Sequence, residues 1–290
     1  MPGFTKRLPV VVEYFTSFSL MFNPMKRPLP LRILPDCLKE KLYYHFYHTR
    51  HSSWRRLFEC APLTFAPGVA MNGLLSGDVI SGNIAFNGFY ELALTRQIVK
   101  LARQGGLLVD VGANMGYFSM LWAGANPTSR VIAFEAAPRN IALMGNNITQ
   151  NRLSERITLV PKAAGNRSGS IAFEVGPDDQ TGWGGISATS STTHITVPLV
   201  RLDQELPDAE IAVLKIDVEG ADTWVLLGSE ALLRNRRVGT IFFEQHKARM
   251  EQLGITKGEA QSFLRGLGYT CVHLDGDESV CSEWMAYPDT

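Results

Sequence analysis

Acidic residues follow the apolar runs of this sequence at four points. They are Asp110, Glu135, Asp217 and Glu244. Runs that are continuously apolar are typical of parallel strands covered by helices on both faces. In such sheets, ligands bind beyond the carboxyl ends of the strands. We therefore expect the four carboxylates to gather at one edge of a sheet, around a ligand.

The first of these acids begins a glycine-containing turn over residues 110–116. Gly112 permits a tight turn, and the helix that follows points free N–H groups at whatever binds there. As a dinucleotide fingerprint the turn is poor, because Asn114 replaces the second glycine and Asp110 would repel a pyrophosphate. A cationic ligand such as S-adenosylmethionine removes that objection. Glu135, at the end of the second strand, is then placed to bind ribose hydroxyls.

The same segments resemble the motifs of FkbM-type methyltransferases, a branch of the class I S-adenosylmethionine-dependent enzymes. The likeness is carried by residues 109–119, 134–138 and 214–222, and it extends from about residue 63 to residue 288. It implies a seven-stranded sheet with a reversed last strand, and methylation of a hydroxyl, often on a sugar, glycolipid or polyketide product. The cofactor-binding residues expected on this basis are Asp110, Gly112, Asn114, Gly116, Glu135, Ala136, Lys162, Ala163, Glu91 and Asp217.

A hydroxyl nucleophile needs a base, and two short segments offer one. Asp217 is followed by Glu219, and Glu244 is followed by His246. Because imidazole titrates near neutral pH, we expect His246 to take the proton and Asp217 to orient the substrate, with Glu219 and Glu244 as further catalytic candidates. The three carboxylates could instead hold a divalent cation. Their spacing matches no metal motif, so a metal is not favoured.

The remaining segments predict the elements that position these residues. Helices are expected at 90–103, 115–125, 138–151, 221–234 and 257–267, and strands at 107–111, 130–135, 157–160, 211–216, 238–243, 269–274 and 282–287. The last two strands are joined by a turn too short for a parallel crossover, so one of them is reversed. The expected fold is α/β: a doubly wound, Rossmann-like, seven-stranded sheet, mostly parallel with one antiparallel strand. A hairpin of 170–175 and 195–200 interrupts it, and its loop 176–193, which contains Trp183, is an expected lid over the substrate.

The chain is expected to divide into three parts. Residues 1–60 form an N-terminal extension, expected to be helical; 61–88 form a short-strand hairpin region; and 89–290 form the methyltransferase domain. The apolar run 8–22 is too short to span a bilayer, so it predicts a packing segment, with contact to a membrane surface as the alternative. The aromatic and basic run 43–51 predicts a packing helix, with nucleobase stacking as the alternative.

Composition limits the class of protein. Hydrophobic residues make up 45% of the chain, which excludes general disorder. Lys and Arg total 28 and so do Asp and Glu, so the net charge of zero argues against a nucleic-acid-binding protein. The four cysteines are too far apart for a metal knuckle or a disulfide framework, which favours a cytoplasmic protein.

We expect a small-molecule or glycan substrate and leave a homodimer open; N-methylation, a nicotinamide-dependent oxidoreductase and a non-catalytic scaffold are the alternatives.

Overall fold

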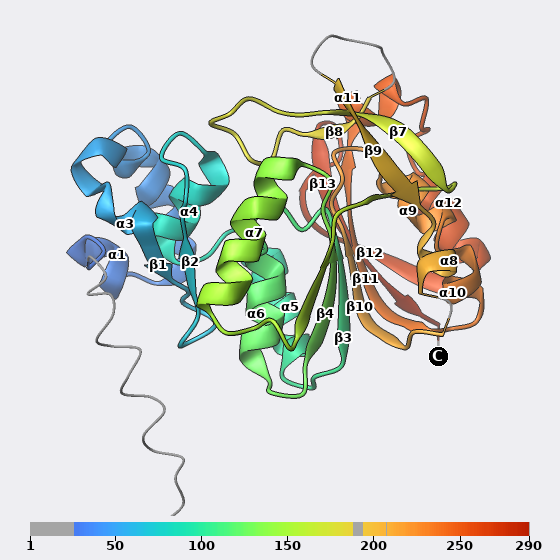
Figure 1. Ribbon diagram of the computed structural model, residues 1–290, viewed down its shortest axis with the longest axis horizontal. Helices are drawn as coiled ribbons and strands as arrows, with labels where there is room; N and C mark the ends of the chain where they lie inside the picture. The colour runs from blue at the N-terminus through green and yellow to red at the C-terminus, as the bar shows by residue number, and fades with distance from the viewer. Residues whose placement is uncertain (1–25, 188–193, 207, 290) are drawn as a thin grey trace, which may run out of the picture.

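The computed structural model describes residues 26–187, 194–206 and 208–289, and a seven-stranded sheet forms its centre (Figure 1). The strand order is β12-β13-β11-β10-β3-β4-β5, and within this sheet β13 alone runs opposite to the other six strands. The strands are β3 (Leu107–Val111), β4 (Arg130–Phe134), β5 (Ile157–Val160), β10 (Ile211–Ile216), β11 (Val238–His246), β12 (Tyr269–Asp277) and β13 (Cys281–Pro288). The predicted Rossmann-like sheet with one reversed strand is confirmed. The order reverses between β3 and β10, which is where such sheets bind ligands.

Helices cover both faces of this sheet, as continuously apolar strands require. On one face lie α5 (Leu92–Ala102), α6 (Tyr117–Ala125) and α7 (Pro138–Gln150); on the other lie α9 (Asp222–Leu227), α10 (Glu230–Arg234) and α12 (Glu259–Gly266). Alternate strand residues enter the two cores: Leu108 and Val213 pack toward α5 and α6, whereas Val109 and Leu214 pack toward α9 and α12. The two cores thus hold the sheet between its helices, and the carboxyl ends of the parallel strands meet at one edge.

The predicted helix 221–234 is divided in two, which corrects that expectation. Gly228 separates α9 from α10, and its carbonyl accepts a hydrogen bond from the backbone N–H of Asp203 at 3.0 Å. A Cβ at Gly228 would lie 1.9 Å from the carbonyl oxygen of Gly165. The close approach of two backbones therefore explains both the glycine and the break.

A second, four-stranded sheet lies beside the carboxyl ends of the central strands, at the top of Figure 1. Its strands, in order, are β6 (Ala163–Ala164), β9 (His194–Val200), β7 (Gly169–Glu174) and β8 (Gly185–Ile186). The predicted hairpin is confirmed, because β7 and β9 pair antiparallel. The loop expected to act as a lid leaves β7 and returns through β8; its residues 188–193 lie outside the described part of the chain.

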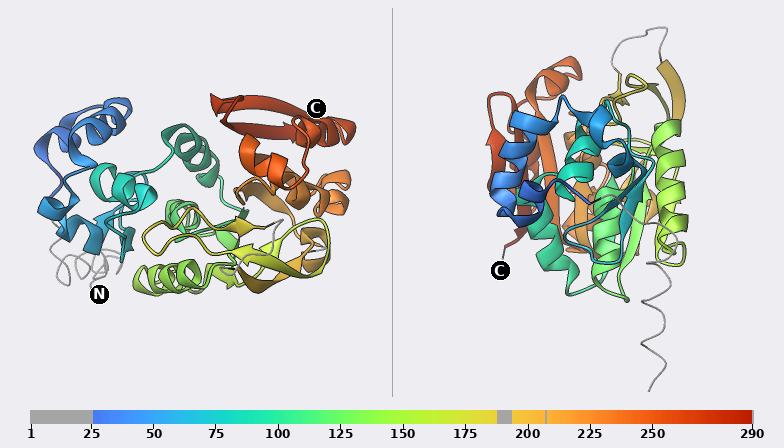
Figure 2. Two further views of the ribbon diagram at one scale, coloured as in Figure 1. Left: turned by 90° about the horizontal axis from the view of Figure 1, so that it is seen from above. Right: turned by 90° about the vertical axis from the view of Figure 1, so that its left-hand side faces the viewer.

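The N-terminal segment lies at one side of the sheet (Figure 2) and shares a hydrophobic core with α5, α6 and α7. Its elements are α1 (Leu29–Ile33), α2 (Asp36–Leu42), the π-helical turn η2 (Tyr43–Tyr47), η3 (His51–Trp54), α3 (Arg56–Glu59), β1 (Cys60–Pro62), β2 (Ala70–Asn72) and α4 (Val79–Asn87). Tyr43 is buried and its ring lies 5.4 Å from that of Phe86, so the aromatic run 43–51 packs through this residue. The apolar run 8–22 lies outside the described residues.

Residues 79–87 form the helix α4 where the sequence predicted short strands and turns. Only β1 and β2 match the expected hairpin. The glycines of this region were misleading: Gly82 is in the middle of α4, where a Cβ would lie 2.0 Å from the hydroxyl of Tyr43. Asp78 caps the start of α4 and Gly88, with φ 80°, ends it. Gly82 therefore serves close packing, whereas Gly88, like Gly73 with φ 67°, serves a change of direction.

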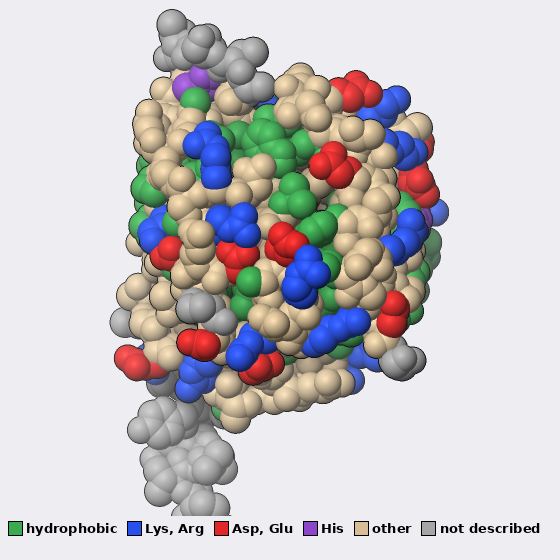
Figure 3. All heavy atoms as spheres, turned by 90° about the vertical axis from the view of Figure 1, so that its right-hand side faces the viewer, with side chains coloured by type: hydrophobic (Ala, Val, Ile, Leu, Met, Phe, Trp, Pro, Cys, Tyr) green, Lys and Arg blue, Asp and Glu red, His purple; other side chains and the backbone are tan. Residues whose placement is uncertain are grey.

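Two short helices complete the described elements, α8 (Leu202–Glu205) and α11 (Lys247–Gln252). On the face that carries α8, α10 and α12, basic and acidic side chains are interspersed, as Figure 3 shows. Within the described ranges, the molecule contains no helix that is both long and apolar enough to span a bilayer. The cytoplasmic location and the homodimer stay predictions.

Candidate active site

A cavity of about 550 Å³ opens at the carboxyl ends of β3, β4, β10 and β11. Most of the side chains that the sequence singled out line it. They are Glu91, Gly112, Asn114, Glu135, Ala136, Lys162, Ala163, Asp217, Glu219, Glu244 and His246. The edge of the sheet that the acidic residues indicated is therefore where the structure has its large cavity.

Asp110 and Gly116 do not line this cavity. Asp110 is 1% exposed, and its Oδ2 accepts a hydrogen bond from Ser119 Oγ of α6 at 2.6 Å. It lies one residue before the end of β3, in register with Lys215 on β10, so its side chain points into the core between the sheet and α6. Gly116 precedes α6, and a Cβ there would lie 2.9 Å from Met144. Both residues thus lie outside the set that lines the cavity, and their contact with a cofactor stays a prediction.

The turn after β3 closes onto the neighbouring strands. The N–H groups of Gly112 and Ala113 donate to the carbonyl of Phe134 at 2.9 and 3.0 Å. Gly112 has φ +75°, and a Cβ there would lie 1.8 Å from the backbone oxygen of Asp217. Asn114 also adopts a left-handed conformation, with φ 54°. The turn therefore brings the ends of β3, β4 and β10 into direct contact.

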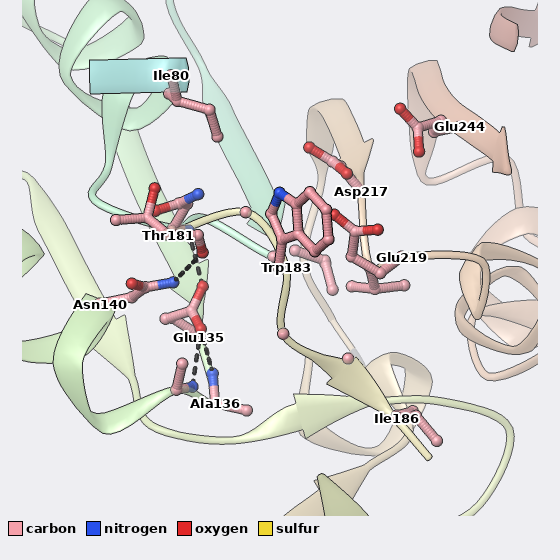
Figure 4. Close-up of a pocket in the computed structure, with 18 of the residues that line it drawn as sticks. Ile80, Glu135, Ala136, Asn140, Thr181, Trp183, Ile186, Asp217, Glu219 and Glu244 are labelled. Carbon is pink, nitrogen blue, oxygen red and sulfur yellow. Dashed lines mark hydrogen bonds between the residues drawn. The ribbon is translucent and has the colours of Figure 1, made fainter. Parts of the chain in front are cut away.

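Glu135 has the hydrogen bonds expected of a ligand-binding carboxylate. It accepts from the backbone N–H groups of Asn114, Ala136 and Ala137 at 2.7, 3.0 and 2.8 Å (Figure 4). Burial raises the pKa of Glu135, and these three bonds oppose that rise. A carboxylate has about four lone-pair positions. One acceptor position is left for a hydroxyl donor, so Glu135 fits the ribose of a nucleoside cofactor.

Lys215 is a buried cation beneath the other end of the cavity. Its Nζ lies 3.0 Å from Asp217 Oδ2 and 3.8 Å from Asp110 Oδ1, and 5.1 Å from the ring centre of Phe118. Burial lowers the pKa of Lys215, but the carboxylates of Asp217 and Asp110 outweigh burial and raise it. Lys215 thus pairs with Asp217 through Oδ2. Within the described residues, the other oxygen of Asp217, Oδ1, has no protein partner.

The other carboxyl groups near Asp217 are crowded; Asp222 is buried and the rest are half-buried. Burial, followed by repulsion from Asp217, raises the pKa of Glu244 to about 10 and that of Glu219 to about 8. The same two causes raise the pKa of Asp222 and of Glu283 to about 7. Glu91, with φ 44°, is half-buried, and its pKa is raised well above the usual range, chiefly by desolvation. The carboxyls of Glu244 and Glu219 are therefore mainly protonated at neutral pH.

We expect this cluster to make the folded protein less stable as the pH rises. A carboxyl whose pKa is raised by folding stabilises the fold at low pH, and that contribution is lost between its ordinary pKa and its raised value. The melting temperature of the free protein is therefore expected to fall from pH 6 to pH 9. Glu244→Gln should flatten this fall and raise the melting temperature at pH 9 by about 3–6 °C. Scanning calorimetry measures both, with exposed Glu155→Gln as the control; a steeper fall in Glu244→Gln would contradict the expectation.

His246 has a different position from the one expected. It ends β11 and caps α11, and its Nδ1 accepts from the backbone N–H of Arg249 at 3.4 Å. Because an N–H can only donate, the neutral ring carries its hydrogen on Nε2. His246 can thus donate a hydrogen bond from Nε2 into the cavity. The bond from Arg249 occupies the Nδ1 lone pair, which His246 would need to act as a base at that atom.

Several lining residues were not singled out in the sequence. Among them are Asp78, Asn140, Thr181, Arg249 and Cys281. Asp78 had a usable signal, since an aspartate three residues before Ser81 is typical of a helix N-cap. Lys162 lines the cavity, but its ammonium group pairs with Glu205 of α8. In the described ranges, no group of three or more His, Cys, Asp or Glu side chains could hold a metal ion, so Asp217, Glu219 and Glu244 do not form one.

Comparison with known proteins identifies relatives of this chain. The family model for the methyltransferase FkbM domain matches residues 110–271. The chain is 27% identical over 172 residues to the hexuronic acid methyltransferase AglP of Haloferax volcanii, covering 58% of this chain and 66% of that protein, just under two thirds. It is 27% identical over 216 residues to the 31-O-demethyl-FK506 methyltransferase FkbM of Streptomyces tacrolimicus, covering 63% of this chain and 80% of that protein. A solved putative rRNA-methylase from Clostridium thermocellum matches with 12% identity and a TM-score of 0.45, covering 68% of this chain and 96% of that one, which is too distant to bear on function.

Proposed function

Because the chain belongs to the FkbM family of S-adenosylmethionine-dependent methyltransferases, we propose that it methylates a hydroxyl group on a sugar, glycan or natural-product small molecule. One observation carries this proposal. A single cavity has Glu135, with an acceptor position left for a ribose hydroxyl, at one end and Asp217 with Glu219 at the other (Figure 4). The names of the two relatives describe a hexuronic acid and a 31-O-demethyl compound as substrates, which supports a hydroxylated acceptor.

At the cofactor end, backbone and side chain would act together. Glu135 would bind the ribose, the turn at Gly112 would leave room for close backbone approach, and Asn114, Ala136 and Ala163 would line the remaining wall. When bound, S-adenosylmethionine supplies a methyl group on a positively charged sulfur. The carboxylate of Asp217, at the same edge of the sheet, would match that positive charge.

At the acceptor end, Asp217 is the residue we propose as the proton acceptor. Lys215 holds Asp217 Oδ2 at 3.0 Å, which fixes the carboxylate and leaves Oδ1 for an acceptor hydroxyl. His246 would donate from Nε2 to a second oxygen of the acceptor. This assignment exchanges the roles that the sequence predicted for Asp217 and His246, because His246 Nδ1 is used to cap α11.

Trp183 gives the acceptor end an apolar surface. Its side chain is 59% exposed although it lines the cavity, and Figure 4 shows it between Thr181 on one side and Asp217 and Glu219 on the other. An aromatic plane beside carboxylates suits a hydroxylated ring, which offers C–H groups on its faces and O–H donors at its edge. The alignment of acceptor and methyl group, with water excluded, would supply most of the catalysis.

Calorimetric titration with S-adenosylhomocysteine tests the cofactor part of this proposal. We expect the wild-type protein to bind it and not to bind NAD. Glu135→Gln should weaken binding by about 10–100-fold, because the amide NH₂ would face backbone N–H donors and one acceptor oxygen would be lost. Glu155→Gln, which makes the same chemical change at an exposed site, is the control. Binding of NAD without S-adenosylhomocysteine would refute the proposal.

A further inference from the structure

The segment 177–186, here called the strap, crosses the cavity and is held at both sides. It follows β7 and ends with β8, and its residues Gln180 to Ile186 line the cavity. On one side Thr181 is bound by Asp78 and Asn140; on the other, Arg249 Nη2 of α11 donates to the carbonyl of Trp183 at 3.3 Å. Figure 4 shows the Thr181 side of this arrangement. The strap is therefore a built element of the site.

Asp78 binds the strap with the same carboxylate that caps α4. The side chain is 1% exposed. Oδ1 accepts from the backbone N–H of Thr181 at 2.9 Å, and Oδ2 accepts from Thr181 Oγ1 at 3.0 Å and from the N–H of Ser81 at 2.8 Å. Gln180 Nε2 adds a bond to the carbonyl of Gly77 at 2.7 Å. The N-terminal segment thus holds a part of the chain that lies 103 residues away.

Helix α7 binds the opposite edge of the strap. Arg139 donates to the carbonyls of Pro177 and Gln180, both at 2.6 Å, and Asn140 Nδ2 donates to the carbonyl of Thr181 at 3.0 Å. The N–H, the hydroxyl and the carbonyl of Thr181 are all paired within the protein. Thr181 is therefore fixed from both neighbours, and it is 2% exposed.

This anchoring determines where Trp183 can lie. Trp183 is two residues from Thr181, and its own carbonyl is held by Arg249. Between them, Gly182 lies so close to α4 that a Cβ would be 3.0 Å from Ile80 Cδ1. With both flanking points fixed, the backbone of Trp183 is held at the cavity, and its indole lies beside Asp217 and Glu219 (Figure 4).

We propose that Asp78 is a positioning residue for the acceptor, which acts through Thr181 to hold the Trp183 indole over the acceptor end. The acceptor class it serves is a hydroxylated ring with an apolar face. This inference rests on the proposed function. It gives the N-terminal segment, which lies outside the matched residues 110–271, a part in selecting the substrate.

Three substitutions separate the strap contact from the folding of α4. Asparagine is a good N-cap, but its one acceptor oxygen cannot serve Ser81 and both donors of Thr181, so Asp78→Asn keeps α4 and loosens the strap. Thr181→Val removes only the hydroxyl, and Thr181→Ser keeps it as the matched control. Trp183 is the only aromatic residue between Glu174 and His194, so chymotryptic cleavage after it reports on the strap alone.

We expect cleavage after Trp183 to be about tenfold faster or more in Asp78→Asn and about threefold faster in Thr181→Val. Thr181→Ser should match the wild type. If Asp78→Asn does not fold, the comparison of Thr181→Val with Thr181→Ser decides the question. Equal cleavage rates in all variants would overturn the inference.

Ligand binding separates the acceptor role from a cofactor role. We expect Asp78→Asn to bind S-adenosylhomocysteine within about twofold of the wild type, because the hydrogen bonds of Asp78 go to Ser81 and Thr181 and none goes to Glu135 or its three donors. In the presence of that ligand, phenyl β-D-glucoside and phenyl β-D-glucuronide serve as acceptor probes by calorimetry, and the better one should bind about tenfold more weakly to Asp78→Asn and to Trp183→Ala. A parallel loss of S-adenosylhomocysteine binding would refute the acceptor role. No binding of S-adenosylhomocysteine to the wild type would refute the proposed function, whereas the cleavage result would still stand.

Discussion

Gly112→Ala is expected to abolish cofactor binding and to destabilise the fold. Gly112 has φ +75°, which costs an L-residue about 1–2 kcal/mol. The larger penalty is steric, since the new Cβ would lie 1.8 Å from the backbone oxygen of Asp217. The turn after β3 and the end of β10 would have to separate, which moves Asp217 and opens the cavity wall. We expect about 3–5 kcal/mol lower unfolding free energy and at least about 100-fold weaker binding of S-adenosylhomocysteine.

Urea unfolding and calorimetric titration measure these two effects. Gly145→Ala is the matched control, because Gly145 lies in α7 with ordinary helical φ and no atom within 4 Å of its added Cβ. That variant should be unchanged or more stable by about 0.5–1 kcal/mol, since alanine favours helix over glycine. A Gly112→Ala protein with wild-type stability and affinity would show that the contact with Asp217 is not essential.

The sheet and most of the cavity could be predicted because they depend on local patterns. Apolar runs predicted the inner strands, and the short connection between the last two predicted strands indicated the reversed one. The carboxyl ends of all parallel strands lie at one edge of the sheet. Acidic residues that follow these strands therefore lie close together, as Glu135 and Asp217 do at the cavity. These inferences need only strand direction and burial.

The positions that were missed depend on register and on contacts distant in sequence. Asp110 is one residue before the end of its strand, so its side chain points to the face opposite its neighbour, toward Lys215 in register on β10. β11 continues to His246 because β13 pairs with it as far as Cys281, which turns His246 into a helix cap. The bond between Asp78 and Thr181 joins two loops with no common pattern. No local pattern contains this information.

The identity of the general base gives the second large effect. Asp217→Asn is expected to lower turnover by about 10²–10⁴-fold, the usual contribution of a positioned base. His246→Gln should lower it by about tenfold or less, because its proposed role is to donate one hydrogen bond. Lys215 remains buried in Asp217→Asn with Asp110 at 3.8 Å as its remaining partner, so the thermal stability of the variant is measured in parallel. Turnover is followed with S-adenosylmethionine and the acceptor found among phenyl glycosides.

Glu219 is the competitor that the pH profile separates from Asp217. Its pKa, raised to about 8 by burial and by Asp217, would suit a base at slightly alkaline pH, and Arg249 lies 4.0 Å from it. If Glu219 were the base, the wild-type rate would rise with an apparent pKa near 8, and Glu219→Gln would cost more than Asp217→Asn. We expect instead that Glu219→Gln costs less than about tenfold. The charge of Asp217 helps to raise the pKa of Glu219, so Asp217→Asn should lower that pKa. The residual activity of Asp217→Asn should therefore depend on Glu219 titrating at a lower pH than in the wild type. A structural defect alone would not produce this shift of the pH profile.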